Sequence, residues 1–91
     1  MSKSRFLNRI ISAADLQEEH LSVLPLIEIA GDRRVLVEHH KGGSEYGENQ
    51  IGILVKFGTV IVLGSGLRLS LMSKDRLIVS GCIDSIQLFR G

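Results

Sequence analysis

The residue types best suited to chemistry form one cluster in the middle of the chain. Glu38, His39 and His40 are consecutive, and Glu45 and Glu48 follow closely. Neighbouring residues on a strand point to opposite faces, so His39 and His40 cannot hold one ion unless the chain bends there. The cluster also lacks the ligand spacing of known zinc motifs. We therefore expect no bound metal and no cofactor, and a structural role for one histidine at the end of a strand. The alternative is a small-ligand or metal site made of Glu38, His39, His40, Tyr46 and Glu48.

Two further features resemble catalytic motifs only in part. Cys82 is a lone cysteine between apolar residues, which is typical of a small core residue and not of a nucleophile. The sequence Gly64-Ser65-Gly66 lacks the lysine of a phosphate-binding loop and precedes a strand pattern, so it predicts a tight turn. We expect no catalytic residue, and hence a protein that is not an enzyme.

The composition argues against nucleic acid and the membrane surface as direct partners. The 91 residues include 11 Lys and Arg against 10 Asp and Glu, so no strong field attracts the chain to nucleic acid or to an anionic membrane. Few aromatic side chains are available to stack on bases, and we expect no nucleic-acid partner. The single cysteine and the absence of a signal-peptide pattern favour the cytoplasm. No apolar run reaches the roughly 18 residues that span a membrane, so any membrane contact is expected to be peripheral or indirect.

The chain divides into two segments with different sequence patterns, residues 1–23 and residues 24–91. In residues 1–23, helical spacing places Phe6, Ile10 and neighbouring apolar residues on one face, with Arg5 and Arg9 beside them. This predicts a short amphipathic helix, whose apolar stripe packs on a sheet or lies in a partner's groove or on a membrane surface.

Residues 24–91 alternate with a period of two, which predicts strands. About seven short strands separated by glycine-containing breaks are expected. The breaks are too short for crossover helices, so the class is all-β and antiparallel, arranged as a two-layer β-sandwich, a small barrel or a short β-solenoid. A change of phase between Ile83 and Ile86 predicts a bulge or corner near Asp84-Ser85.

Several apolar residues fall on the strand faces that the alternation assigns to solvent. They are Leu36, Leu54, Val60, Val62 and Ile78. Either the N-terminal helix covers them or they form a surface for self-association or for a partner, because contiguous apolar patches usually mark interfaces. With Phe6, Ile10, Arg5 and Arg9 of the helix, they are the predicted partner-binding residues.

The start Leu24-Pro25-Leu26 of the first expected strand, the segment Val37-Glu38-His39-His40-Lys41-Gly42 and the later glycines form one pattern over about residues 24–89. This pattern resembles the YabP/YqfC family of sporulation proteins, and most closely its YqfC branch. The matching positions are Pro25, Gly31, Glu38, His40, Gly42, Tyr46, Gly58, Gly64 and Gly81. The chain differs from the family pattern at His39, where asparagine is usual, and at Gly52, where arginine is common.

The resemblance implies a non-enzymatic role in endospore formation, in the cytoplasm of the mother cell. It also implies an immunoglobulin-like β-sandwich and a membrane-bound sporulation partner such as YqfD. We therefore expect a protein-protein interaction module that binds this partner, itself as a homo-oligomer, or both. A self-assembling structural component of a spore layer is the alternative.

Overall fold

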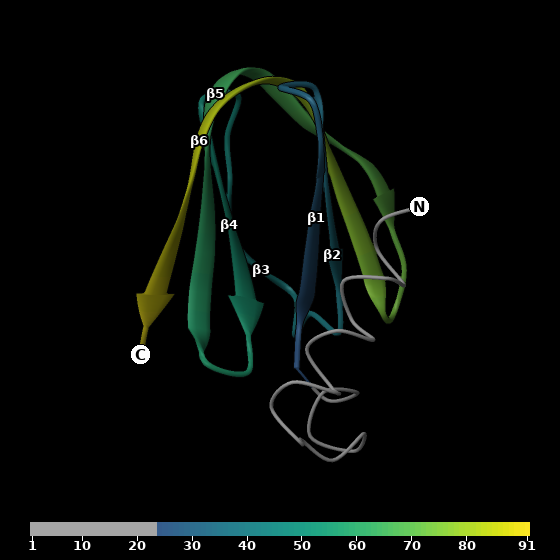
Figure 1. The fold of residues 1–91 in the computed structure, drawn as a ribbon, viewed down its shortest axis with the longest axis vertical. Helices are drawn as coiled ribbons and strands as arrows, with labels where there is room; N and C mark the ends of the chain where they lie inside the picture. Colours follow the sequence, from purple (N-terminus) through teal and green to yellow (C-terminus); the bar gives the residue numbers. More distant parts are fainter. Residues whose placement is uncertain (1–23) are drawn as a thin grey trace, which may run out of the picture.

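The computed structural model describes residues 24–91, which form one antiparallel β-sheet (Figure 1). The strands are β1 (Leu26–Ala30), β2 (Arg34–Glu38), β3 (Gly43–Tyr46), β4 (Gln50–Val55), β5 (Gly58–Met72) and β6 (Arg76–Arg90). Their order across the sheet is β1-β2-β6-β5-β4-β3. The all-β, antiparallel class predicted from the alternation is thus confirmed. The predicted N-terminal helix, with Phe6, Ile10, Arg5 and Arg9, lies outside the described residues.

Strands β5 and β6 are much longer than predicted, at 15 residues each. The predicted tight turn at Gly64-Ser65-Gly66 is wrong, because β5 continues through it, and β6 likewise continues through Gly81. A short strand that was not predicted, β3, precedes β4. The sheet therefore has six strands instead of about seven.

Both long strands bend where they pair with each other, close to these glycines (Figure 1). A side chain at Gly64 would overlap the carbonyl oxygen of Cys82, and one at Gly81 would come within 2.6 Å of the carbonyl oxygen of Gly66. Glycine therefore lets the two backbones cross at close range. The pairing also shifts by one residue so that Ser85 lies opposite Leu63 and Ile83 opposite Gly64. This shift confirms the bulge predicted near Asp84-Ser85, and bulges sharpen the bending of a strand.

The bend folds the sheet into an arch with two facing layers (Figure 1). In what we call the β1–β2 layer, β1 pairs with β2, and β2 pairs with residues 76–80 of β6. Those residues of β6 pair in turn with residues 68–72 of β5. In the β3–β4 layer, β3 pairs with β4, and β4 pairs with residues 58–63 of β5. Those residues of β5 pair in turn with residues 85–90 of β6. The layers remain parts of one continuous sheet, so the two separate sheets of an immunoglobulin-like sandwich are not confirmed.

The hydrophobic core lies between the layers. Its buried residues are Val35, Val37, Leu77 and Val79 from the β1–β2 layer, Ile51, Ile53, Val55, Val60 and Val62 from the β3–β4 layer, and Leu67 and Ile83 near the bend. The alternation predicted the inward faces of β2 and β4. It failed for Val60 and Val62, which were expected on the solvated face and are fully buried. They lie opposite Ile53 and Ile51, and residues directly opposite on neighbouring strands share a face.

Candidate interaction surfaces

The predicted apolar face is divided between different parts of the molecule. Leu36 and Ile78 are cross-strand partners on the outer face of the β1–β2 layer, and both are half-buried. Leu54 lies on the outer face of the β3–β4 layer and is 39% exposed. Because Val60 and Val62 belong to the core, the predicted residues do not form one patch.

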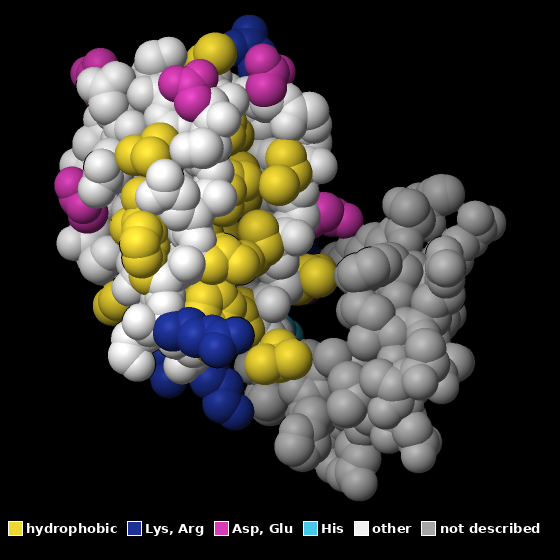
Figure 2. All heavy atoms as spheres, turned by 60° about the vertical axis from the view of Figure 1, so that its left-hand side comes forward, with side chains coloured by type: hydrophobic (Ala, Val, Ile, Leu, Met, Phe, Trp, Pro, Cys, Tyr) yellow, Lys and Arg dark blue, Asp and Glu magenta, His cyan; other side chains and the backbone are white. Residues whose placement is uncertain are grey.

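A larger apolar surface covers the outer face of the β3–β4 layer. Leu54, Thr59 and Phe89 form one cross-strand row, and Ile61 belongs to the next. Beside them is a shallow hollow of about 390 Å³, lined by Gln50, Thr59, Ile61, Leu63, Gln87 and Phe89. We call Leu54, Ile61, Leu63 and Phe89 the apolar patch. Figure 2 shows hydrophobic side chains gathered on the side of the molecule that carries the C-terminal part of β6.

Gly52 contributes to the apolar character of this surface. It occupies the position opposite Ile61, where the family pattern commonly has arginine. A Cβ at Gly52 would come within 2.5 Å of the Ser44 hydroxyl oxygen and 3.3 Å of the Ile61 side chain, so these side chains cover the glycine. The patch thus has no charged side chain at its centre. The alternation did not predict Ile61, Leu63 and Phe89 as surface residues. The run from Thr59 to Leu63 is apolar on both faces, and only its pairing with β4 and β6 shows which face is buried.

The C-terminal part of β6 is also an open edge within the described residues. Strand β2 pairs only with residues 76–80 of β6, whereas residues 85–90 pair with β5 alone. Unpaired strand edges can accept another strand. This edge adjoins the patch at Phe89.

The histidine segment connects the two layers. The His40 Nδ1 accepts a hydrogen bond of 2.9 Å from the Gly42 backbone N–H, so the proton of the neutral ring is on Nε2, which donates to the Ser73 carbonyl at 2.8 Å. The predicted structural role for one histidine is thereby confirmed. His39 adopts a φ of 64° and is exposed. Within residues 24–91 no group of three or more His, Cys, Asp or Glu side chains is arranged to hold a metal ion.

The remaining motif residues surround this connection and the bend. Glu38 forms an ion pair of 3.3 Å with Arg76 across β2 and β6. The Tyr46 hydroxyl donates to the Met72 sulfur at 3.8 Å, which joins β3 to the end of β5. The other motif positions lie at strand ends, turns and the bend: Pro25, Gly31, Gly42, Gly58, Gly64 and Gly81. In this structure these residues shape the fold, and Glu48 lies in the loop before β4.

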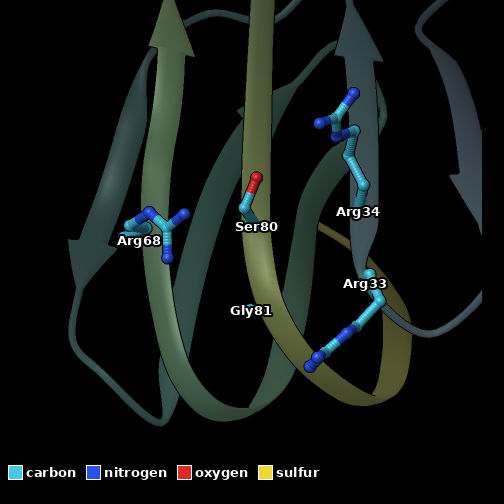
Figure 3. A pocket seen from close by; sticks show the side chains of 5 residues that line it. All are labelled: Arg33, Arg34, Arg68, Ser80 and Gly81. Atoms are coloured by element: carbon cyan, nitrogen blue, oxygen red, sulfur yellow. The ribbon is translucent and has the colours of Figure 1, made fainter.

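A basic hollow of about 310 Å³ lies on the outer side of the β1–β2 layer, near the bend. Its lining residues are Arg33, Arg34, Arg68, Ser80 and Gly81, and Figure 3 shows the three arginines arranged around Ser80 and Gly81. Sequence reasoning missed this site. The arginines occupy polar positions in segments that are far apart in the sequence, and only the strand pairing brings them together.

Among residues 24–91 there is no helix with the length and hydropathy to cross a membrane.

Comparison with known proteins agrees with the motif analysis. No family model matches the chain, and no solved structure matches it. The chain is 22% identical over 85 residues to the uncharacterized protein YqfC of Bacillus subtilis (strain 168), an alignment that covers 93% of this chain and 91% of YqfC. The resemblance to the YqfC branch is therefore confirmed, and this chain is similar to YqfC along almost its entire length.

Proposed function

We propose that this protein is a non-enzymatic interaction module of endospore formation, which acts in the mother-cell cytoplasm and binds a membrane-bound sporulation protein such as YqfD. The observation that carries the proposal is the apolar patch, in which Phe89 is 51% and Leu54 39% exposed beside a hollow. An exposed apolar patch on a small domain usually marks a protein interface. The likeness to YqfC supports the sporulation context through the family resemblance.

The free edge of β6 strengthens this assignment of the surface. A partner segment that pairs with residues 85–90 would place its side chains beside Phe89 and the hollow. Backbone hydrogen bonds along a strand edge supply affinity, and neighbouring pockets supply specificity.

The test is a pull-down of the YqfD-type protein from solubilised membranes with the full-length chain. Phe89→Glu places a charge in the patch and is expected to lower the captured amount at least tenfold. The matched control is Leu71→Glu, since Leu71 is 42% exposed on the outer face of the other layer. Circular dichroism verifies that both variants fold. Undiminished capture by Phe89→Glu, or equal loss in both variants, would refute the patch as the interface.

The unpaired edge of β6 also favours a second candidate, self-assembly of the chain into a spore layer. Its test is the absolute mass of the purified protein by light scattering, over a concentration series at two salt concentrations. Self-assembly predicts large assemblies of the chain alone that persist in high salt. A mass that stays at one or two chains would exclude this role.

A further inference from the structure

We propose that Arg33, Arg34, Arg68 and Ser80 form a binding site for a phosphate group. The site lies on the outer side of the β1–β2 layer, away from the apolar patch, and its existence does not depend on the proposed partner. Arg34 is the cross-strand neighbour of Ser80 on β6, and Ser80 is in turn the neighbour of Arg68 on β5. The three residues thus form one row across three strands, and Arg33 reaches the same hollow from the turn before β2 (Figure 3).

The three arginines that line the hollow concentrate positive charge there. No ion pair joins Arg33, Arg34 or Arg68 to any of residues 24–91. The same layer does pair Arg76 with Glu38, so unpaired arginine is not a general property of this surface. The positive charges of the three lining arginines add up at the hollow and attract an anion bound there.

Ser80 supplies a polar group at the floor of the hollow. It is only 9% exposed, and its hydroxyl lies 2.8 Å from the hydroxyl of Ser70. Either hydroxyl can be the donor in this pair, and when Ser70 donates, the Ser80 O–H is left to donate to an anion in the hollow. The floor therefore adds a neutral hydrogen-bond donor to the charged ones.

The backbone around the hollow is held in place by the bend. The Gly81 N–H donates to the Arg33 carbonyl at 3.1 Å, and the Ile83 N–H donates to the Asp32 carbonyl at 2.8 Å. These bonds attach the turn that carries Arg33 to β6. The backbone of β5 also lies close to Gly81, because a Cβ at Gly81 would collide with the Gly66 carbonyl oxygen. A preorganised backbone lowers the entropy lost when the side chains order around a ligand.

Phosphate is the anion whose chemistry fits this arrangement. A terminal phosphate has three acceptor oxygens, one for each guanidinium, and arginine binds phosphate through parallel N–H donors. The hollow is open to solvent, so the phosphate can belong to a small molecule or to a phospholipid headgroup. The shared chemistry is a phosphate monoester, and the two sources are separated by experiment.

The experiment measures binding of inorganic phosphate to the full-length protein by NMR, followed at the arginine Nε–H and Ser80 amide signals. Flotation with phosphatidylcholine vesicles, with and without phosphatidic acid, forms the second arm. We expect saturable binding of phosphate, which the double variant Arg34→Gln/Arg68→Gln weakens at least tenfold and Arg33→Gln weakens severalfold. Recruitment that requires phosphatidic acid would identify a headgroup as the source, whereas phosphate binding without recruitment would identify a soluble ligand.

The matched control is Lys56→Gln/Arg90→Gln, which removes the same charge from exposed positions in the β4–β5 turn and at the end of β6. This control is expected to bind phosphate like the unmodified protein. Absence of binding in both arms, or equal weakening in the control and the arginine variants, would overturn the proposal. A loss of capture in the Phe89→Glu pull-down leaves this test unaffected, because the two sites lie on different layers.

Discussion

His40 shows at the scale of single residues how a chemically suggestive motif can serve the fold. Both nitrogens of its ring form hydrogen bonds to backbone groups, those of Gly42 just before β3 and of Ser73 in the turn between β5 and β6. The neighbouring backbone adds a bond of 2.7 Å from the His39 N–H to the Asp75 carbonyl and another of 2.7 Å from the Lys41 N–H to the Leu54 carbonyl. The segment therefore holds the lower ends of the two layers together.

Replacing His40 by alanine is expected to destabilise the protein without changing any ligand binding. Two hydrogen bonds are lost, and their net contribution suggests a decrease of about 1–3 kcal/mol in the free energy of unfolding. Urea denaturation followed by circular dichroism measures the change. His39→Asn is the control, and an equal decrease in that variant would contradict the role given to His40.

His39 itself tests the backbone conformation of the same segment. Its φ of 64° lies in the left-handed region, which asparagine tolerates and β-branched residues do not. We expect His39→Val to cost about 1–2 kcal/mol. His39→Asn, which restores the residue usual in the family, is expected to leave the melting temperature unchanged or slightly raised. Melting temperatures that do not separate the two variants would argue against a left-handed residue here.

At the scale of elements, the bend in β5 and β6 decides the architecture. Glycine occurs both in turns and where two backbones approach closely, and the sequence does not distinguish the two uses. The pattern therefore predicts strand ends at Gly64 and Gly81. In the structure both strands continue, and the bulge at Asp84 accommodates the change of direction. One bent sheet thus encloses a core that would otherwise need two sheets.

Gly64→Ala tests whether close backbone approach is what the bend requires. The new methyl group would overlap the Cys82 carbonyl oxygen, so we expect a loss of about 3 kcal/mol or more, or failure to fold. Gly66→Ala is the matched control, because a Cβ there meets nothing within 4 Å and only the φ of 59° opposes it. That variant should lose about 1–2 kcal/mol. Solubility and urea midpoints of the two proteins give the comparison, and similar losses would refute the overlap.

At the scale of the whole molecule, a single core unites the two layers. Residues of both layers contribute to one buried cluster. Its composition depends on the pairing of β4 with β5, which directs Val60 and Val62 inward and leaves Ile61 and Leu63 on the outer face. The same pairing therefore creates both the core and the proposed partner surface.

Val60→Ala is expected to weaken the whole fold. Val60 is fully buried, so removing its methyl groups should cost about 2–3 kcal/mol, with unfolding still in one transition. Leu54→Ala removes a larger side chain from a site that is 39% exposed and should cost less than about 1 kcal/mol. Denaturation curves of both variants check this difference. A larger effect of Leu54→Ala would place the core on the other face of the sheet.

The alternation and the local motifs were enough to predict the all-β antiparallel class, the inward residues of β2 and β4, the bulge near Asp84 and a structural role for one histidine. These features depend on a period of two and on local conformational preferences, which are present in short segments. The strand pairing was needed to show which side of the apolar run from Thr59 to Leu63 is buried, that the glycines bend the strands without ending them, and that Arg33, Arg34 and Arg68 line one hollow with Ser80. Alternation defines two faces of a strand but not which of them the neighbouring strands cover, and contacts between distant segments arise only from their register.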